Sequence, residues 1–267
     1  MALSPLLRGY DQVILDLDGC VWIGDQPVEG SVAAIGILRE AGKRVAFVTN
    51  NSWHAGEDHV AKLWGLGVQA SLADVVTVGG AVQHRLAETR SGRTAFVIGR
   101  ESLRRHVADA GLKVLNGTDL ASRVDVVVVG GTDDVHYDDL RNASLSVRRG
   151  AELLGTARDP TLPMPDGHWP GSGAILAAVE TASETTATIV GKPMPQLFLT
   201  ALDRLGEGRT LVVGDRLDSD IAAAAAAGLD AALVLSGGAT EEDAAGAPTP
   251  GPVAVAATLG ELVSGGA

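Results

Sequence analysis

VILDLDG, at residues 13–19, is the stretch of this chain from which the fold is inferred. Its apolar first half is typical of a buried strand, and Asp16 and Asp18 follow where that strand should end. Because successive side chains of a strand point to opposite faces, the two aspartates are expected to share one face. Ligands of open α/β sheets bind outside the carboxyl ends of the strands, so this stretch predicts a polar site at such an edge.

Short apolar runs alternate with helical patterns on both sides of this strand. Further strands are predicted at 44–49, 75–78, 188–190, 210–214 and 231–235, and helices at about 195–205 and 218–227. Strands that alternate with helices form βαβ units, whose connections are nearly always right-handed. The predicted fold is therefore α/β, with a doubly wound parallel sheet.

The middle of the chain has the pattern of a second, smaller α/β unit. Apolar strands are predicted at 94–98 and 124–129, and a helical pattern follows each of them. We therefore expect residues 1–90 and 187–267 to form a core domain, and residues 91–186 to form an inserted domain.

The composition excludes several classes of function. The 267 residues carry a formal net charge of -12, and an acidic chain does not attract nucleic acids or anionic membranes. Cys20 is the only cysteine, which excludes an intrachain disulfide and a multi-cysteine zinc site. No stretch approaches the ~18 consecutive apolar residues of a membrane span. We expect a soluble, cytoplasmic protein whose partner is a small metabolite.

Polar residues follow three other predicted strands. They are Thr49 at the end of the strand at 44–49 with Asn50 and Asn51 directly after it, Lys192 after 188–190, and Asp215 and Asp220 after 210–214. Each pattern alone also fits a turn, a helix cap or a solvated surface charge. Together they supply what phosphoryl transfer needs, namely a nucleophile, a proton donor and groups that hold the phosphoryl oxygens. Clustered carboxylates repel one another, and oxygen ligands of this kind suit Mg²⁺.

The order and flanks of these motifs resemble the haloacid dehalogenase superfamily. More closely, they resemble the nitrophenylphosphatase-like subclass, IIA, in which a large α/β cap is inserted between the second and third motifs. The strings that carry the resemblance are DLDG at 16–19, VTNNS at 48–52, GKP at 191–193 and GDRLDSDI at 214–221, with DP at 159–160 and PGSG at 170–173 in the insert. The resemblance covers nearly the whole chain.

The resemblance implies a Mg²⁺-dependent phosphatase that forms an aspartyl-phosphate. Asp16 would be the nucleophile and a metal ligand. Asp18 would be the general acid and base, with its backbone carbonyl facing the metal. Lys192 would neutralise the nucleophile and the phosphate, Asp215 would bind Mg²⁺, and Asp220 would orient the metal site without binding the metal.

The resemblance also implies how the substrate is held. Thr49, Asn50 and Asn51 would hold phosphate oxygens, and the insert would be the cap that selects the substrate. Within it, the irregular segment 158–171 is the best candidate for contact with the leaving group, through Arg158 and Leu162. Leu162 stands where relatives specific for pyridoxal phosphate carry His. Sugar phosphates, glycerol phosphate, phosphoglycolate and nucleotides are the candidate substrates, and a homodimer through the cap is a further expectation.

Other functions fit the sequence less well. Dehalogenases of this superfamily generally lack the second aspartate, which is Asp18 here, and phosphomutases usually carry a small helical cap. A phospho-acceptor signalling or binding module of similar core fold is about half this length. The glycines at 171 and 173 lack the third glycine of the Gly-x-Gly-x-x-Gly pattern, so they do not indicate a dinucleotide-binding loop.

Overall fold

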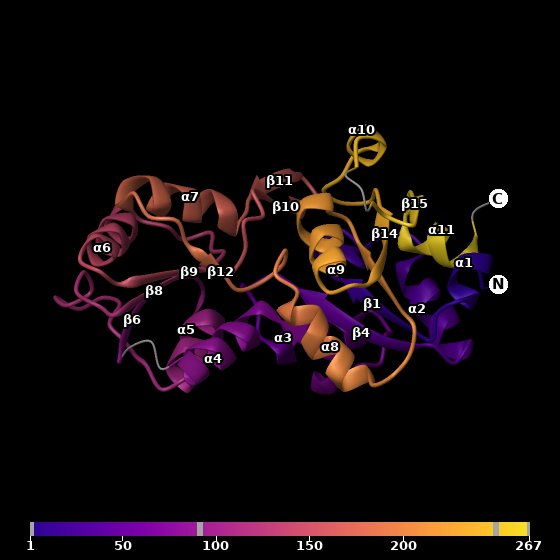
Figure 1. Cartoon of the computed structure of the whole chain (residues 1–267), viewed down its shortest axis with the longest axis horizontal. Coiled ribbons are helices and arrows are strands. Elements are labelled where there is room, and N and C mark those ends of the chain that lie inside the picture. The colour runs from indigo at the N-terminus through magenta and orange to yellow at the C-terminus, as the bar shows by residue number, and fades with distance from the viewer. Residues whose placement is uncertain (1–2, 90–92, 248–250, 266–267) are drawn as a thin grey trace.

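Two α/β bodies lie side by side along the long axis of the molecule (Figure 1). The computed structural model describes residues 3–89, 93–247 and 251–265. In the larger body the strand order is β15-β14-β13-β1-β4-β5, and every neighbouring pair is parallel. Its strands are β1 (Gln12–Asp16), β4 (Arg44–Thr49), β5 (Val75–Thr77), β13 (Thr210–Gly214), β14 (Asp230–Val234) and β15 (Ala254–Ala256). The predicted doubly wound α/β fold is confirmed.

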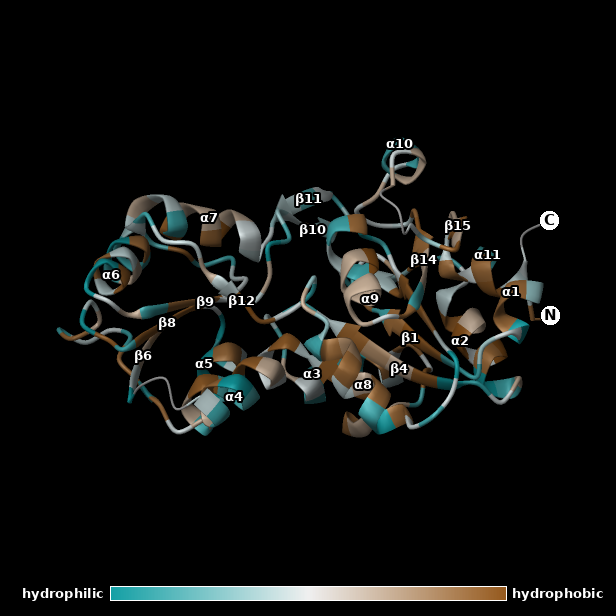
Figure 2. Cartoon of the chain, in the orientation of Figure 1, coloured by the Kyte–Doolittle hydropathy of each residue, from teal (hydrophilic) through white to brown (hydrophobic). Residues whose placement is uncertain are grey.

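Both faces of this sheet are covered by helices, which explains why its strands are apolar throughout. In β1, Val13 and Leu15 pack into one core cluster and Ile14 into the other. Helices α1 (Pro5–Arg8), α2 (Ser31–Glu40), α3 (Gly56–Gly65) and α11 (Leu259–Ser264) contribute to the first, and α8 (Gln196–Leu205) and α9 (Ala222–Ala226) to the second. Figure 2 shows β1 and β4 predominantly in the colour of hydrophobic residues.

The smaller body is a parallel sheet of order β12-β9-β8-β6-β7. Its strands are β6 (Thr94–Ile98), β7 (Lys113–Val114), β8 (Val126–Val129), β9 (Glu152–Gly155) and β12 (Thr188–Ile189). Helices α4 (Val78–Thr89) and α5 (Glu101–Asp109) supply one core cluster, and α6 (Tyr137–Arg148) and α7 (Ser172–Ser183) the other. The smaller body therefore has a hydrophobic core of its own.

The chain returns from the smaller body to the larger body later in the sequence than we predicted. Thr188–Ile189 was assigned to the core, but β12 pairs with β9 at the edge of the smaller sheet. The chain enters the larger body after this short edge strand. Val82 and Leu86 of α4, also assigned to the core, pack against the smaller sheet. The other predicted crossing, at 90/91, lies outside the described residues.

Two short hairpins connect the bodies beside the carboxyl edge of the larger sheet. One is β2 (Trp22–Ile23) with β3 (Gln26–Pro27), and the other is β10 (Thr161–Met164) with β11 (Gly167–Pro170). The second corrects the prediction of an irregular segment at 158–171. The hairpins touch at their turns, because a Cβ at Gly24 (φ +53°) would lie 2.7 Å from Cδ of Pro165.

The remaining elements of the described chain are short. They are the 3₁₀ turn η1 (Leu72–Asp74), the π-helical turn η2 (Leu217–Ile221) and α10 (Glu241–Ala245). The predicted helix at 218–227 is thus a π-helical turn that continues into α9. No helix in the described ranges is long and apolar enough to cross a membrane.

Candidate active site

The predicted site residues, with the exception of Arg158, line one pocket at the carboxyl edge of the larger sheet. Asp16 ends β1, Thr49 ends β4, and Asp215 directly follows β13. These three strands are neighbours in the sheet, so their ends lie side by side. The pocket has a volume of about 60 Å³, and its lining includes Asp16, Asp18, Thr49, Asn50, Asn51, Lys192, Asp215 and Asp220.

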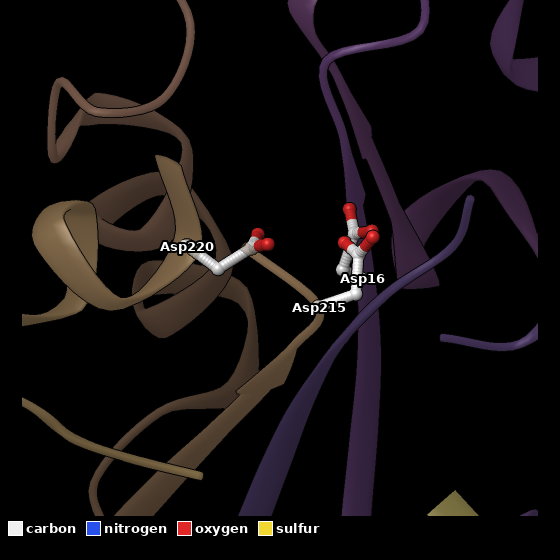
Figure 3. Close-up of side chains that lie close together, drawn as sticks. All are labelled: Asp16, Asp215 and Asp220. Atoms are coloured by element: carbon white, nitrogen blue, oxygen red, sulfur yellow. The ribbon is translucent and has the colours of Figure 1, made fainter. Parts of the chain in front are cut away.

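Three buried carboxylates converge at the base of this pocket (Figure 3). Asp16, Asp215 and Asp220 each offer an oxygen within 4.8 Å of the others, and each side chain is buried. Burial, with repulsion from Asp220, raises the pKa of Asp215 to about 8. Burial also raises the pKa of Asp16 well above its usual range. Two buried carboxyl groups whose pKa values are raised form an environment that a divalent cation would stabilise, so Asp16 and Asp215 fit Mg²⁺.

Two glycines leave room for the Asp215 carboxylate. A Cβ at Gly237 would lie 2.1 Å from Oδ2 of Asp215, and a Cβ at Gly19 would lie 2.3 Å from the same atom. The backbone N–H of Gly238 donates a hydrogen bond of 2.6 Å to this oxygen. The orientation of Asp215 therefore depends on close backbone approach from two segments.

Lys192 is the cation of the cluster. Its buried Nζ donates hydrogen bonds to Oδ1 of Asp16 at 2.5 Å and to Oδ1 of Asp220 at 2.6 Å. Burial opposes the charge, but the attraction of the two carboxylates is stronger and raises the pKa of Lys192 above its ordinary value. The second oxygen of Asp220 accepts a hydrogen bond from the backbone N–H of Arg216 at 3.1 Å. Asp220 thus connects Lys192 to the loop after β13.

The Asp18 side chain accepts hydrogen bonds from three side chains outside this cluster. Trp22 Nε1 donates to Oδ1 at 3.1 Å, Thr49 Oγ1 donates to Oδ2 at 3.2 Å, and Asn51 Nδ2 lies 3.3 and 3.2 Å from the two oxygens. Three donors fix the carboxylate in the lining of the pocket, where it can exchange a proton with a bound group. The donor role of Trp22 is one that the sequence analysis did not identify.

Asn50 holds several segments of the site together. Its amide nitrogen lies within hydrogen-bonding distance of Asp159 Oδ2 at 2.9 Å, of the Lys192 carbonyl at 3.1 Å and of Ser219 Oγ at 3.3 Å. Its carbonyl oxygen accepts the Lys192 backbone N–H at 2.8 Å. Asn50 therefore lines the pocket together with Thr49 and Asn51, and its side chain is bonded to other groups of the protein.

The inserted domain contributes residues that sequence reasoning only partly identified. Asp159 lines the pocket, and burial raises its pKa although Asn50 and Arg216 lie beside it. In the sequence, only the motif DP at 159–160 indicated that Asp159 belongs to the site. Leu162, which was predicted to contact the substrate, also lines the pocket. Arg158 instead forms two hydrogen bonds, of 2.9 and 2.7 Å, with Glu180 of α7 and is not among the lining residues.

Cys20 lies beside the site but is sequestered from it. The residue is fully buried, and its thiol lies 3.9 Å from the Val213 carbonyl oxygen. Burial raises the pKa of this thiol well above its usual value, and the neighbouring aspartates add to the effect. Both the burial and the raised pKa favour the protonated form of the thiol, which is a weaker nucleophile than the thiolate.

Two family models match the chain. One is described as haloacid dehalogenase-like hydrolase and matches residues 13–113, and the other is described as HAD-hydrolase-like and matches residues 189–262. The D-glycerol 3-phosphate phosphatase of Mycobacterium tuberculosis is 37% identical over 236 residues, which are 88% of this chain and 65% of that relative. The chain thus spans slightly less than two thirds of that protein. The acid sugar phosphatase of Staphylococcus aureus is 32% identical over 239 residues, or 89% of this chain and 91% of the relative.

Solved structures show the same architecture. The glycerol phosphate phosphatase of Mycobacterium tuberculosis in complex with magnesium superposes with a TM-score of 0.86 at 37% identity, over 98% of this chain and 79% of the other. The 4-nitrophenylphosphatase of Thermotoga maritima gives a TM-score of 0.84 at 30% identity, over 97% and 98% of the two chains. The similarity therefore extends over both bodies of the molecule.

Proposed function

The chain belongs to the haloacid dehalogenase-like hydrolases, within the nitrophenylphosphatase-like subclass, and we propose that it is a Mg²⁺-dependent phosphatase of small phosphate monoesters. The observation that carries the proposal is the convergence of Asp16, Asp18, Lys192 and Asp215 from separate segments on one pocket. Within the family these residue types are those of acid-catalysed phosphoryl transfer to a carboxylate. The magnesium complex of a relative supports the choice of metal.

In the proposed first step, a carboxylate oxygen of Asp16 attacks phosphorus and the bond to the leaving oxygen breaks. Asp18 donates a proton to that oxygen, so an alcohol rather than an alkoxide departs. Lys192 holds the Asp16 carboxylate in place and neutralises part of the phosphate charge. In the second step Asp18 takes a proton from water, which attacks the phosphoryl group and releases phosphate and free Asp16.

The metal would be held by the carboxylates of Asp16 and Asp215 and by the Asp18 carbonyl. When bound, Mg²⁺ would supply positive charge to the phosphoryl oxygens. Both oxygens of Asp220 already accept hydrogen bonds, from Lys192 and from the Arg216 backbone. This supports the proposal that Asp220 orients the site instead of binding the metal.

The substrate that we propose is a glycerol phosphate or a sugar phosphate. The two curated relatives described above are named for such substrates. The sequence also left phosphoglycolate and nucleotides as candidate substrates, but neither of these two relatives is named for them. A cytoplasmic location and a homodimer remain proposals.

Measuring phosphate release from p-nitrophenyl phosphate, with Mg²⁺ and then with excess chelator, tests the proposed function. Turnover should require the metal and return when Mg²⁺ is restored. Full activity in chelator would contradict the metal assignment. Stoichiometric phosphorylation of the protein without turnover would indicate the phospho-acceptor signalling module instead.

A further inference from the structure

A second, larger cavity opens beside the catalytic pocket. It has a volume of about 630 Å³ and shares Asp18, Asn51, Trp53 and Leu162 with the lining of that pocket. Its other walls come from the β2–β3 hairpin, from α3 with the loop before it, and from β10. We call it the side cavity. It is large enough for a small organic group, because ligand pockets of proteins usually measure ~300–1,000 Å³.

The position of Asp18 relates this cavity to the reaction. Under the proposed function, on which this inference rests, Asp18 protonates the leaving oxygen. The leaving group must then extend from the phosphate past the Asp18 carboxylate. Since Asp18 lines both spaces, the side cavity is where the rest of the substrate would lie.

Lys62 is one of the cations of the side cavity, and its charge is already compensated. Its Nζ donates a hydrogen bond of 2.5 Å to the Gly24 carbonyl and lies 3.4 Å from Oδ1 of Asp25. The same ammonium lies 4.4 Å from the centre of the Trp22 ring. A carboxylate, a carbonyl and an aromatic face thus surround it.

Arg100, from the inserted domain, is compensated in the same way. Its guanidinium lies 4.1 Å from the centre of the Trp53 ring and donates a hydrogen bond of 2.7 Å to Asp133. His59 adds no charge, because burial lowers its pKa to about 4. The remaining histidine of the lining, His54, is exposed and meets the His59 ring edge-on at 5.8 Å.

Carboxylates complete the lining. Asp18, Asp25 and Asp58 all face the side cavity. Their oxygens can accept hydrogen bonds from hydroxyl groups, and Asp25 and Asp58 repel a second anion. We propose that the side cavity selects an uncharged, hydroxyl-bearing leaving alcohol and rejects a leaving group that carries a carboxylate or a second phosphate. Asp25 contributes to this rejection by neutralising Lys62.

Two substrates of nearly equal size test the selection. Glycerol 3-phosphate and 3-phosphoglycerate differ chiefly in a hydroxymethyl group and a carboxylate at one end. We expect kcat/KM of the wild-type protein to be at least tenfold higher for glycerol 3-phosphate. Equal values would overturn the inference. Activity toward p-nitrophenyl phosphate is measured in parallel, and its absence would overturn the proposed function as well.

Asp25→Asn tests the origin of the selection. The side chain is exposed, so the substitution should not disturb folding, and it leaves Lys62 free to pair with a substrate carboxylate. The preference for glycerol 3-phosphate should fall about two- to fivefold, the scale of an exposed ion pair. Lys62→Gln should raise the preference. Asp138→Asn removes an exposed carboxylate that pairs with Arg141 on α6 and should leave it unchanged. The inference is overturned if Asp25→Asn and Asp138→Asn give the same ratio.

Discussion

At the scale of single residues, the buried ion pairs of Lys192 decide how the nucleophile is presented. Asp16 and Asp220 share its ammonium group, and all three side chains are buried. Charges taken out of water are costly unless they are paired and hydrogen-bonded. Apolar residues of similar volume would fill the same space without the free-energy cost of desolvating these charges. We therefore assign the arrangement to catalysis and not to stability.

Asp16→Asn tests the nucleophile. The amide keeps the shape of the side chain but cannot form an acyl phosphate in the same way. Turnover of p-nitrophenyl phosphate should fall by more than the ~10²–10⁴-fold typical of general acid–base groups, because a covalent step is lost. Mass spectrometry should find no phosphoryl group at residue 16. A phosphoenzyme mapped to another residue would contradict the assignment, and an unchanged Tm would exclude a folding defect.

Asp18→Asn tests proton transfer. The donors Trp22 and Asn51 can still meet the amide oxygen, so the position of the side chain should change little. Alkyl phosphates should lose more activity than p-nitrophenyl phosphate, because an alkoxide needs the proton and p-nitrophenolate does not. The comparison requires kcat for both substrates in both proteins. Equal losses across leaving groups would argue against a proton donor at this position.

At the scale of structural elements, the β10–β11 hairpin brings the inserted domain to the site. Leu162 of β10 lines both the catalytic pocket and the side cavity. The guanidinium of Arg158, four residues earlier, pairs with Glu180 on α7. The hairpin thus separates two residues that the sequence analysis had grouped as substrate contacts.

This separation gives a paired prediction. Leu162→Ala removes apolar surface from the cavity wall and should change the ranking of natural substrates by several-fold in kcat/KM. Arg158→Ala removes an exposed ion pair and should change the ranking less. Both variants are assayed against the same panel of sugar and polyol phosphates. A larger change from Arg158→Ala would place the specificity contacts elsewhere in the insert.

At the scale of the whole molecule, the proposed metal-binding carboxylates of Asp16 and Asp215 link metal binding to stability. Any ligand that binds only the folded state stabilises it, by about 2.7 kcal/mol at a concentration one hundred times Kd. Mg²⁺ should therefore raise the Tm of the wild-type protein by several degrees. Asp215→Asn should reduce or abolish the increase. Differential scanning fluorimetry with Mg²⁺ and with chelator measures this without any substrate, and equal shifts in the two proteins would remove Asp215 from the metal site.

The sequence by itself determined the fold class and the residues at the strand ends. Strands β4 and β13 were predicted with the bounds that the structure has, because a strand covered on both faces is a continuous apolar run. The sequence also placed Asp16, Thr49 and Asp215 at the carboxyl ends of predicted parallel strands. These are local patterns, and a single sequence contains them in full.

Only the tertiary structure decided which side chains form hydrogen bonds and ion pairs with one another. The bonds of Asn50 to Asp159 and Lys192, and of Trp22 to Asp18, depend on how segments pack. The same holds for β12, a two-residue strand that joins the smaller sheet, and for the pairing of Lys62 with Asp25. The physical reason is that hydrogen bonds and ion pairs act over a few ångströms, so partners distant in sequence are defined only once the chain has folded.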